Sequence, residues 1–150
     1  MFTFTDGQKE ELLKWADELE HTQKPQTISY LRDVNGFCCL GVLCDMQERV
    51  FWGLSWGPDE ERYYIFDRGY YLCLPDDLAN KLGLLQMTSD IDPDAPISLQ
   101  SLFQEMNDDC LFSFAKIAKE IRHLVKSGSF SKPTQKKLSV RQTATLSEGK

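Results

Sequence analysis

The sequence predicts an α+β fold, in which four to five helices pack against a small antiparallel sheet of two hairpins, about four strands in all. Amphipathic patterns with helical spacing open and close the body of the chain, near residues 6–20 and 113–125. Between them, short apolar and aromatic runs flank Asn-Gly and Asp-Arg-Gly, which are turn signals of β-hairpins. A chain of 150 residues suffices for one domain with a single core. We expect a globular domain over residues 1–126 and a flexible basic tail over residues 127–150.

The first helix is predicted for about residues 6–20. Thr5 or Asp6 can accept hydrogen bonds from the free amide groups at its start, and Pro25 prevents its continuation. One broad apolar face should dock on the core, and it consists of Leu12, Leu13, Trp15, Ala16 and Leu19.

A hairpin should follow, with strands at residues 28–32 and 37–40 joined by a turn at Asn35-Gly36. The next segment, about residues 41–50, is apolar over most of its circumference when drawn as a helix. Such a helix is expected at the centre of the molecule, covered on more than one side.

Residues 51–71 hold eight of the seventeen aromatic side chains of the chain. Gly53, Gly57 and Pro58 indicate a loop in the first part of this segment. Further along, residues 62–66 and 70–74 have the composition of strands joined by Asp67-Arg68-Gly69, so a second hairpin is predicted there.

Three more helices are predicted, over residues 75–82, from Ser98 to about residue 107, and from Ser113 to about residue 125. A surface loop rich in aspartate and proline should connect the first two. After residue 125 bulky apolar residues become rare, so residues 127–150 are expected to be disordered.

The charge of −6 is unevenly distributed, because residues 126–150 carry six lysine or arginine residues and one acidic residue, which leaves −11 for the rest. A body this acidic is not expected to bind duplex nucleic acid, whose phosphates require neutralisation. It could instead meet a basic protein surface. Five cysteines without paired spacing, no signal peptide and no long apolar run predict a reduced cytoplasmic protein without membrane contact. Its oligomeric state is left open.

The run G-F-C-C-L-G-V-L-C-D at residues 36–45 resembles the signature of a family of small uncharacterised proteins encoded by phages and prophages. Other matching segments are Leu12-Leu13-Lys14-Trp15, residues 26–32, Asn107-Asp108 and residues 113–118. The resemblance covers about residues 8–125. It implies no reaction, ligand or cofactor, and the longer basic tail of this chain departs from the family pattern.

The aromatic segment is the predicted binding site. Tyrosine and tryptophan rings offer flat faces to a base or another planar ligand, and arginine side chains could hold its phosphate or carboxylate. Core packing explains strand aromatics equally well, but tryptophans in a glycine-rich loop are harder to explain by packing alone. The predicted ligand-binding residues are Trp52, Trp56, Arg62, Tyr63, Tyr64 and Arg68. A further hypothesis pairs Asp45 with Arg32 or Arg49 beneath them.

The cysteines and histidines offer a second type of site, for zinc or for a cysteine nucleophile. The residues concerned are Cys38, Cys39, Cys44, Cys73, Cys110, His21 and His123. No C-x-x-C pair is present, and Cys38 and Cys39 would point to opposite faces of a strand. Buried, unreactive thiols are therefore the favoured interpretation, with no metal, no cofactor and no catalytic residue assigned.

The leading functional hypothesis is a small non-enzymatic binding protein of phage type. It would capture a planar anionic ligand such as a nucleotide, or a host protein, and so modulate host defence. One alternative is an acidic decoy that imitates the charge of DNA and blocks a basic host protein, which the clusters of acidic residues allow. The other alternative is a cysteine enzyme or a zinc-binding protein.

Overall fold

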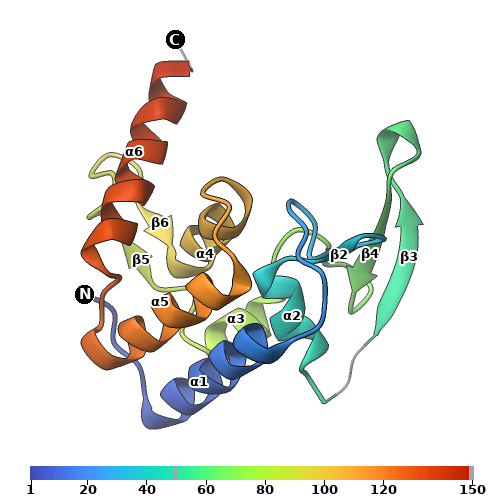
Figure 1. The fold of residues 1–150 in the computed structure, drawn as a ribbon, viewed down its shortest axis with the longest axis horizontal. Coiled ribbons are helices and arrows are strands. Elements are labelled where there is room, and N and C mark those ends of the chain that lie inside the picture. Colours follow the sequence, from blue (N-terminus) through green and yellow to red (C-terminus); the bar gives the residue numbers. More distant parts are fainter. Residues whose placement is uncertain (49–50, 149–150) are drawn as a thin grey trace.

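The computed structural model describes the backbone of residues 1–48 and 51–148 and the side chains up to residue 140. Within this part the fold is α+β, as predicted, with six α-helices, a four-stranded antiparallel sheet and a small two-stranded sheet (Figure 1). The helices gather on one side of the molecule and the larger sheet on the other (Figure 1). No helix in the described residues is long and apolar enough to cross a membrane.

The predicted helix starts are confirmed by their caps. Helix α1 (Asp6–His21) begins at Thr5, which forms a capping box with Gln8. Ser98 caps α4 (Leu99–Asp108) and Ser113 caps α5 (Phe114–Ser127). The predicted helix near residues 75–82 is present as α3 (Asp76–Lys81).

The core lies where α1, α2 (Cys39–Asp45), α4 and α5 meet, and α1 runs along α5 (Figure 1). All residues of α2 except Asp45 are buried, which confirms the central position predicted for this helix. Trp15 is fully buried and its ring meets the ring of Phe103 edge-on at 5.1 Å. The indole N–H of Trp15 donates to the carbonyl of Cys39 at 3.0 Å, which fixes α1 to the first turn of α2.

The larger sheet has the strand order β2-β1-β4-β3, so β3 is an edge strand. Its strands are β1 (Arg32–Asp33), β2 (Gly36–Phe37), β3 (Trp52–Trp56) and β4 (Arg62–Phe66), all paired antiparallel. A 3₁₀ turn (Pro58–Glu60) joins β3 to β4 at the tip of a hairpin that stands away from the helices (Figure 1). The second sheet pairs β5 (Met87–Thr88) with β6 (Ile97–Ser98), just before α4.

The strand predictions were wrong at four places. Of the predicted strand at residues 37–40 only Phe37 is in β2, because Cys38 caps α2, which therefore begins two residues earlier than predicted and ends at Asp45. Residues 52–56 form a strand and not a loop, because tryptophan and leucine alternate there with small residues, while Gly57 and Pro58 supply the turn. Residues 70–74 are not a strand and contribute only an isolated bridge between Phe66 and Tyr70. Of residues 28–32 only Arg32 is in a strand, since the chain bends at Ser29, which has φ 75°.

The predicted disorder of the C-terminal tail is wrong up to residue 140. Helix α6 spans Lys132–Glu148, and Phe130, Thr134 and Leu138, spaced four residues apart, are buried against the body. The carboxylate of Glu120 accepts hydrogen bonds from the amide and hydroxyl of Ser131 and from the hydroxyl of Thr134. These hydrogen bonds fix the start of α6. A search of the sequence for apolar periodicity does not detect such a polar contact. The predicted flexibility of residues 149–150 lies outside the described residues.

Candidate functional site

Five of the six predicted site residues lie on the β3–β4 hairpin and Arg68 follows it, and the six do not converge. The register pairs Trp56 with Arg62 and Leu54 with Tyr64, so these residues share one face of the sheet with Trp52. Tyr63 points to the opposite face, since it neighbours Tyr64 in the strand. Arg68 lies beyond the strand, in a turn where its φ is 66°, and its guanidinium stands 5.5 Å from the ring of Phe51.

Arg32 occupies the inner part of the shared face. Its guanidinium carbon lies 4.1 Å from the ring centre of Tyr64, 4.8 Å from that of Phe37 and 5.6 Å from that of Trp52. Cation–π contacts of this kind contribute about 0.5–2 kcal/mol each, according to their exposure. The arginine is therefore already covered by rings of its own chain, and it serves the packing of β1 and β2 on the hairpin.

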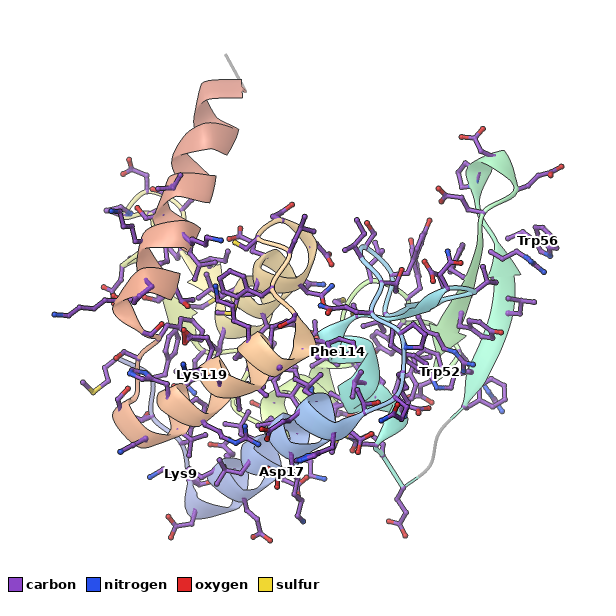
Figure 2. The ribbon with its side chains drawn as sticks, viewed as in Figure 1. Lys9, Asp17, Trp52, Trp56, Phe114 and Lys119 are labelled. Atoms are coloured by element: carbon purple, nitrogen blue, oxygen red, sulfur yellow. The ribbon has the colours of Figure 1, made fainter. Side chains whose placement is uncertain are left out.

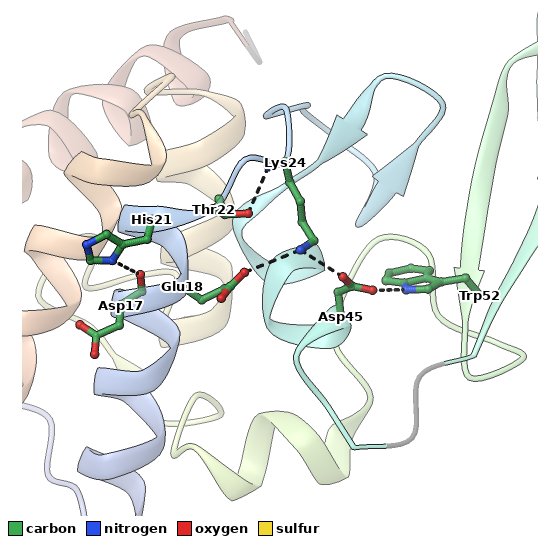
Figure 3. A network of polar contacts seen from close by, with 7 residues as sticks. All are labelled: Asp17, Glu18, His21, Thr22, Lys24, Asp45 and Trp52. Carbon is green, nitrogen blue, oxygen red and sulfur yellow. Dashed lines mark hydrogen bonds and ion pairs between the residues drawn. The ribbon is translucent and has the colours of Figure 1, made fainter.

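Trp52 is held by a polar chain that begins on α1 (Figure 3). Its indole N–H donates to Asp45 at 3.0 Å, and the other oxygen of Asp45 lies 3.3 Å from the ammonium of Lys24. Lys24 also reaches Glu18 on α1, at 3.6 Å. Asp45 thus pairs with Lys24 and not with Arg32, and the hypothesised pairing with Arg49 falls outside the described residues. Trp52 joins the sheet to the helices and is a structural residue.

The outer part of the same face is exposed. Trp56 is 64% exposed and Leu54 is 51% exposed, and Figure 2 shows Trp56 directed away from the helical body. The guanidinium of Arg62 lies 5.5 Å from the ring of Trp56 and covers part of it. Core packing does not account for an exposed tryptophan beside an exposed leucine on an edge strand.

The backbone of β3 is also available at its outer side. At the two ends of the hairpin, the amide of Asp67 donates to the carbonyl of Phe51 and the amide of Gly57 donates to the carbonyl of Glu61. Hydrogen-bonded pairs alternate along an antiparallel ladder, so between these ends Gly53 and Ser55 bond to β4. The intervening residues, Trp52, Leu54 and Trp56, therefore turn their N–H and C=O groups to the free edge, where no strand of the described chain pairs with them.

The opposite face of the hairpin carries a stack of tyrosines. The ring of Tyr63 lies parallel to that of Tyr30 at 4.7 Å and stands 5.2 Å from that of Tyr71. The hydroxyl of Tyr30 donates to Glu61 at 2.8 Å, and this bond raises the pKa of Tyr30 above its ordinary value. The ring of Tyr71 also stands 6.4 Å from that of Tyr30, so the three rings form a cluster. One flat face of Tyr63 is thus covered by Tyr30 and is not free to stack on a ligand.

A cavity of about 540 Å³ adjoins this tyrosine stack. Three carboxylates, those of Asp33, Glu60 and Glu61, line it together with a single cation, Arg62. Like charges disfavour binding of a phosphate or carboxylate, so the cavity is poorly suited to an anionic ligand.

The cysteine motif forms the core of the fold. Cys38 caps α2 by accepting the amide of Gly41 at its sulfur, and burial raises the pKa of Cys38 to about 12. Burial also raises the pKa of Cys39 and of Cys44 well above the ordinary value for a thiol. A raised pKa keeps a thiol protonated, which is the opposite of what a nucleophile or a metal ligand requires.

The two glycines of the motif permit close backbone contacts. A Cβ on Gly36 would lie 2.2 Å from the carbonyl oxygen of Pro25, and one on Gly41 would lie 1.7 Å from that of Leu31. The chain therefore requires a glycine at position 36 because it passes close to Pro25, and not because of a turn. Gly36 is in β2, and the turn of the first hairpin is Val34-Asn35, one residue earlier than predicted.

The histidines do not complete a catalytic pair with the motif. His21 bonds to the carbonyl of Asp17 within α1, and His123 bonds to the carbonyl of Ser129 after α5. Within the described residues no group of three or more His, Cys, Asp or Glu side chains could hold a metal ion. Burial raises the pKa of Cys73 as well, so neither it nor the three motif thiols are activated.

Asn107 is an important residue whose role the sequence did not indicate, since it appeared only as a helix terminator. Its buried side-chain oxygen accepts the amide of Cys39 at 3.1 Å and the side-chain amide of Gln26 at 2.8 Å. Its own amide donates to the carbonyl of Thr27 at 2.9 Å and to Asp108 at 2.8 Å. One side chain thus ties α4 to the start of α2 and to the segment before β1.

The family model of a domain of unknown function, DUF8296, matches residues 8–125 of the chain. The chain belongs to the DUF8296 family. In the structure of this DUF8296 chain, the matched residues include the larger sheet, the cysteine motif and most of α1 and α5. No curated protein and no solved structure matches it.

Proposed function

We propose that the chain is a non-enzymatic binding protein, which recognises a partner protein by adding an extended segment of it to the free edge of β3. The observation that carries this proposal is the coincidence, on one short edge strand, of free backbone groups and exposed apolar side chains. Trp52, Leu54 and Trp56 present their backbone groups outward, and Leu54 and Trp56 are exposed on one face. Strand addition uses both features, because main-chain bonds supply affinity and alternate side chains supply specificity.

The charge around the hairpin favours a basic partner segment. The tip carries Asp59, Glu60 and Glu61 in succession, at the end of β3 that is marked by Trp56. Residues 1–125 together carry a net charge of −11, which would attract a basic partner before contact. In view of the resemblance to phage-encoded proteins, we propose that this partner is a host protein. The acidic surface on which the decoy hypothesis rested would therefore serve to attract the basic partner to the edge of β3.

A planar anionic ligand is less well supported. Arg32 is enclosed by three rings, Tyr63 is stacked on Tyr30, and Trp52 is bonded to Asp45. The adjoining cavity carries three carboxylates and one arginine. A nucleotide would have to displace these contacts, whereas an extended peptide would add to an edge that is already formed.

A selection from displayed random peptides, followed by amide hydrogen exchange, tests the proposed function. Enriched peptides should alternate apolar with other residues and carry lysine or arginine at one end. Binding should slow exchange at the outward amides of Trp52, Leu54 and Trp56, while those of Gly53 and Ser55 change little because they already bond to β4.

A matched pair of variants separates the edge from a general effect of charge. Leu54→Lys places a charge on the free edge and should abolish peptide binding. Met87→Lys makes the same chemical change on β5, where the side chain is 58% exposed, and should leave binding intact. Peptides that bind equally well to both variants, or that slow exchange only outside β3, would refute the proposal. Sedimentation of the chain alone reveals whether a second copy occupies the edge instead.

A further inference from the structure

A second cavity lies at the end of the molecule opposite the β3–β4 hairpin, where α6 and the N-terminal segment meet (Figure 1). Its volume is about 340 Å³, which is at the lower end of the range for small-molecule sites. The apolar side chains that line it are those of Met1, Phe2, Ile91, Leu102 and Phe130. Met1 is 89% exposed and Ile91 is half-buried, whereas Phe2, Leu102 and Phe130 are buried beneath them in the core. These side chains come from the N-terminal segment, the loop after β5, α4 and the connection between α5 and α6. The rest of the lining comes largely from α6 itself, so the cavity depends on the docking of that helix.

The polar rim of this cavity is mainly basic. Lys132 and Lys136 lie one helical turn apart on α6, and both line the cavity. Asp90, in the loop after β5, lines the same cavity. None of the ion pairs within the described residues includes these lysines or this aspartate. The rim thus carries two positive charges against one negative charge.

The position of the two lysines in the helix is unfavourable without a counter-ion. Lys132 is in the first turn of α6, where the helix dipole favours negative groups. Lys136 follows at the spacing where like charges repel. The buried carboxylate of Glu120 neutralises the helix start itself, but it is bonded to Ser131 and Thr134. A bound anion at the rim would relieve the repulsion between the lysines.

We propose that this cavity binds a small amphipathic anion, an acidic head group with a short alkyl chain. The alkyl chain lies against Met1 and Ile91, which are the accessible apolar side chains of the cavity, and the head group lies between Lys132 and Lys136. A ligand without a chain would leave Met1 and Ile91 in contact with water, and one without a negative charge would leave the lysines unpaired. The combination of wall and rim therefore selects for both parts of the ligand. This proposal is independent of the partner site on β3.

Titration of the full chain with octanoate, followed by NMR, tests this inference. We expect saturable binding of one molecule, with a dissociation constant on the order of 1 mM for so small a ligand. The largest shifts should belong to Ile91, Phe130 and their neighbours. Octyl phosphate should bind comparably, whereas octanol and octylammonium should bind at least about fivefold more weakly, because they lack the negative charge.

Two double variants, one at the rim and one away from it, provide the control for charge. Replacing Lys132 and Lys136 by glutamine should weaken octanoate binding by about tenfold. Replacing Lys126 and Lys137 by glutamine removes the same charge from residues that do not line the cavity, and should change binding by less than about twofold. Lys137 instead lies 5.2 Å from the ring of Phe112.

Several results would overturn the inference. These are the absence of saturable binding, equal binding of octylammonium, shifts confined to the β3–β4 hairpin, or equal effects of the two double variants. Vesicles of anionic phospholipid separate a free amphiphile from a lipid surface. If the protein sediments with such vesicles but does not bind octanoate, the ligand is a membrane surface and the proposed cavity site is wrong.

Discussion

Replacement of Gly41 by alanine should destabilise the protein strongly. Gly41 is in the first turn of α2, and a Cβ there would lie 1.7 Å from the carbonyl oxygen of Leu31 and 2.6 Å from its carbonyl carbon. Contacts between such atoms require about 3.5 Å, so helix and loop must separate by nearly 2 Å. The same carbonyl accepts the amide of Cys38, and the separation breaks that bond as well.

The size of the effect follows from three contributions. Overpacking against a backbone that cannot rotate away costs about 3 kcal/mol, and loss of the bond from Cys38 costs about 1 kcal/mol. Alanine is better than glycine in a helix by about 1 kcal/mol, which offsets part of this cost. We therefore expect the free energy of unfolding to fall by about 3 kcal/mol, a large share of the stability of a small domain.

Urea denaturation followed by far-UV circular dichroism measures this change, with Gly7→Ala as the control. Gly7 lies in the first turn of α1, and a Cβ there would meet only the hydroxyl of Thr5, at 3.9 Å. The control should raise the free energy of unfolding by about 0.5–1 kcal/mol. If Gly41→Ala lowers it by less than about 1 kcal/mol, the close approach of α2 to Leu31 is not what the motif glycine provides.

Two further predictions concern the buried polar and thiol groups. Asn107→Leu leaves the amide of Cys39 without a partner and should lower the free energy of unfolding by about 3–5 kcal/mol. The control Asn80→Leu, at an exposed helical position, should change the free energy of unfolding by less than about 0.5 kcal/mol. Similar effects of the two variants would contradict the role of Asn107. Burial raises the pKa of Cys38 to about 12, so the folded state keeps a proton that the unfolded state loses near the ordinary pKa of 9.0. Stability should therefore be constant at lower pH and fall as the pH rises from about 9 toward 12. The expected fall is up to about 1.4 kcal/mol per pH unit for each such thiol. Denaturation curves at about pH 7 and about pH 10 check this decrease, and it should be smaller in Cys38→Ala.

The helices were predictable because their signals are local. Thr5, Ser98 and Ser113 each stand at a helix start that an apolar stripe confirms, and capping and periodicity depend only on neighbours within a few residues. The strands were predicted less well, since pairing joins distant segments. Trp52 and Leu54 alternate with small residues, but Gly53 obscured the pattern, and only the register with β4 shows that this run is a strand.

The candidate site was predicted by composition but not by geometry. The aromatic segment does carry the exposed surface, yet its members divide between two faces and a turn. Whether a tryptophan is anchored, like Trp52 by Asp45, or free, like Trp56, depends on a partner seven residues away that no local pattern indicates. The helix after residue 131 was missed for a related reason, because Glu120 holds it through polar bonds.

The bonds of Asn107 also bear on how the chain folds. They join this residue to Cys39 and Gln26, which precede it by 68 and 81 positions, so most of the chain must be synthesised before they can form. Closing loops of this length costs entropy that is recovered only when both ends are in place, which slows folding and couples the two halves of the molecule. A fragment that ends before α4 would expose the amide of Cys39 and the apolar surface of α2. During translation, the nascent chain should therefore remain unfolded, and dependent on protection from aggregation, until α4 has left the ribosome.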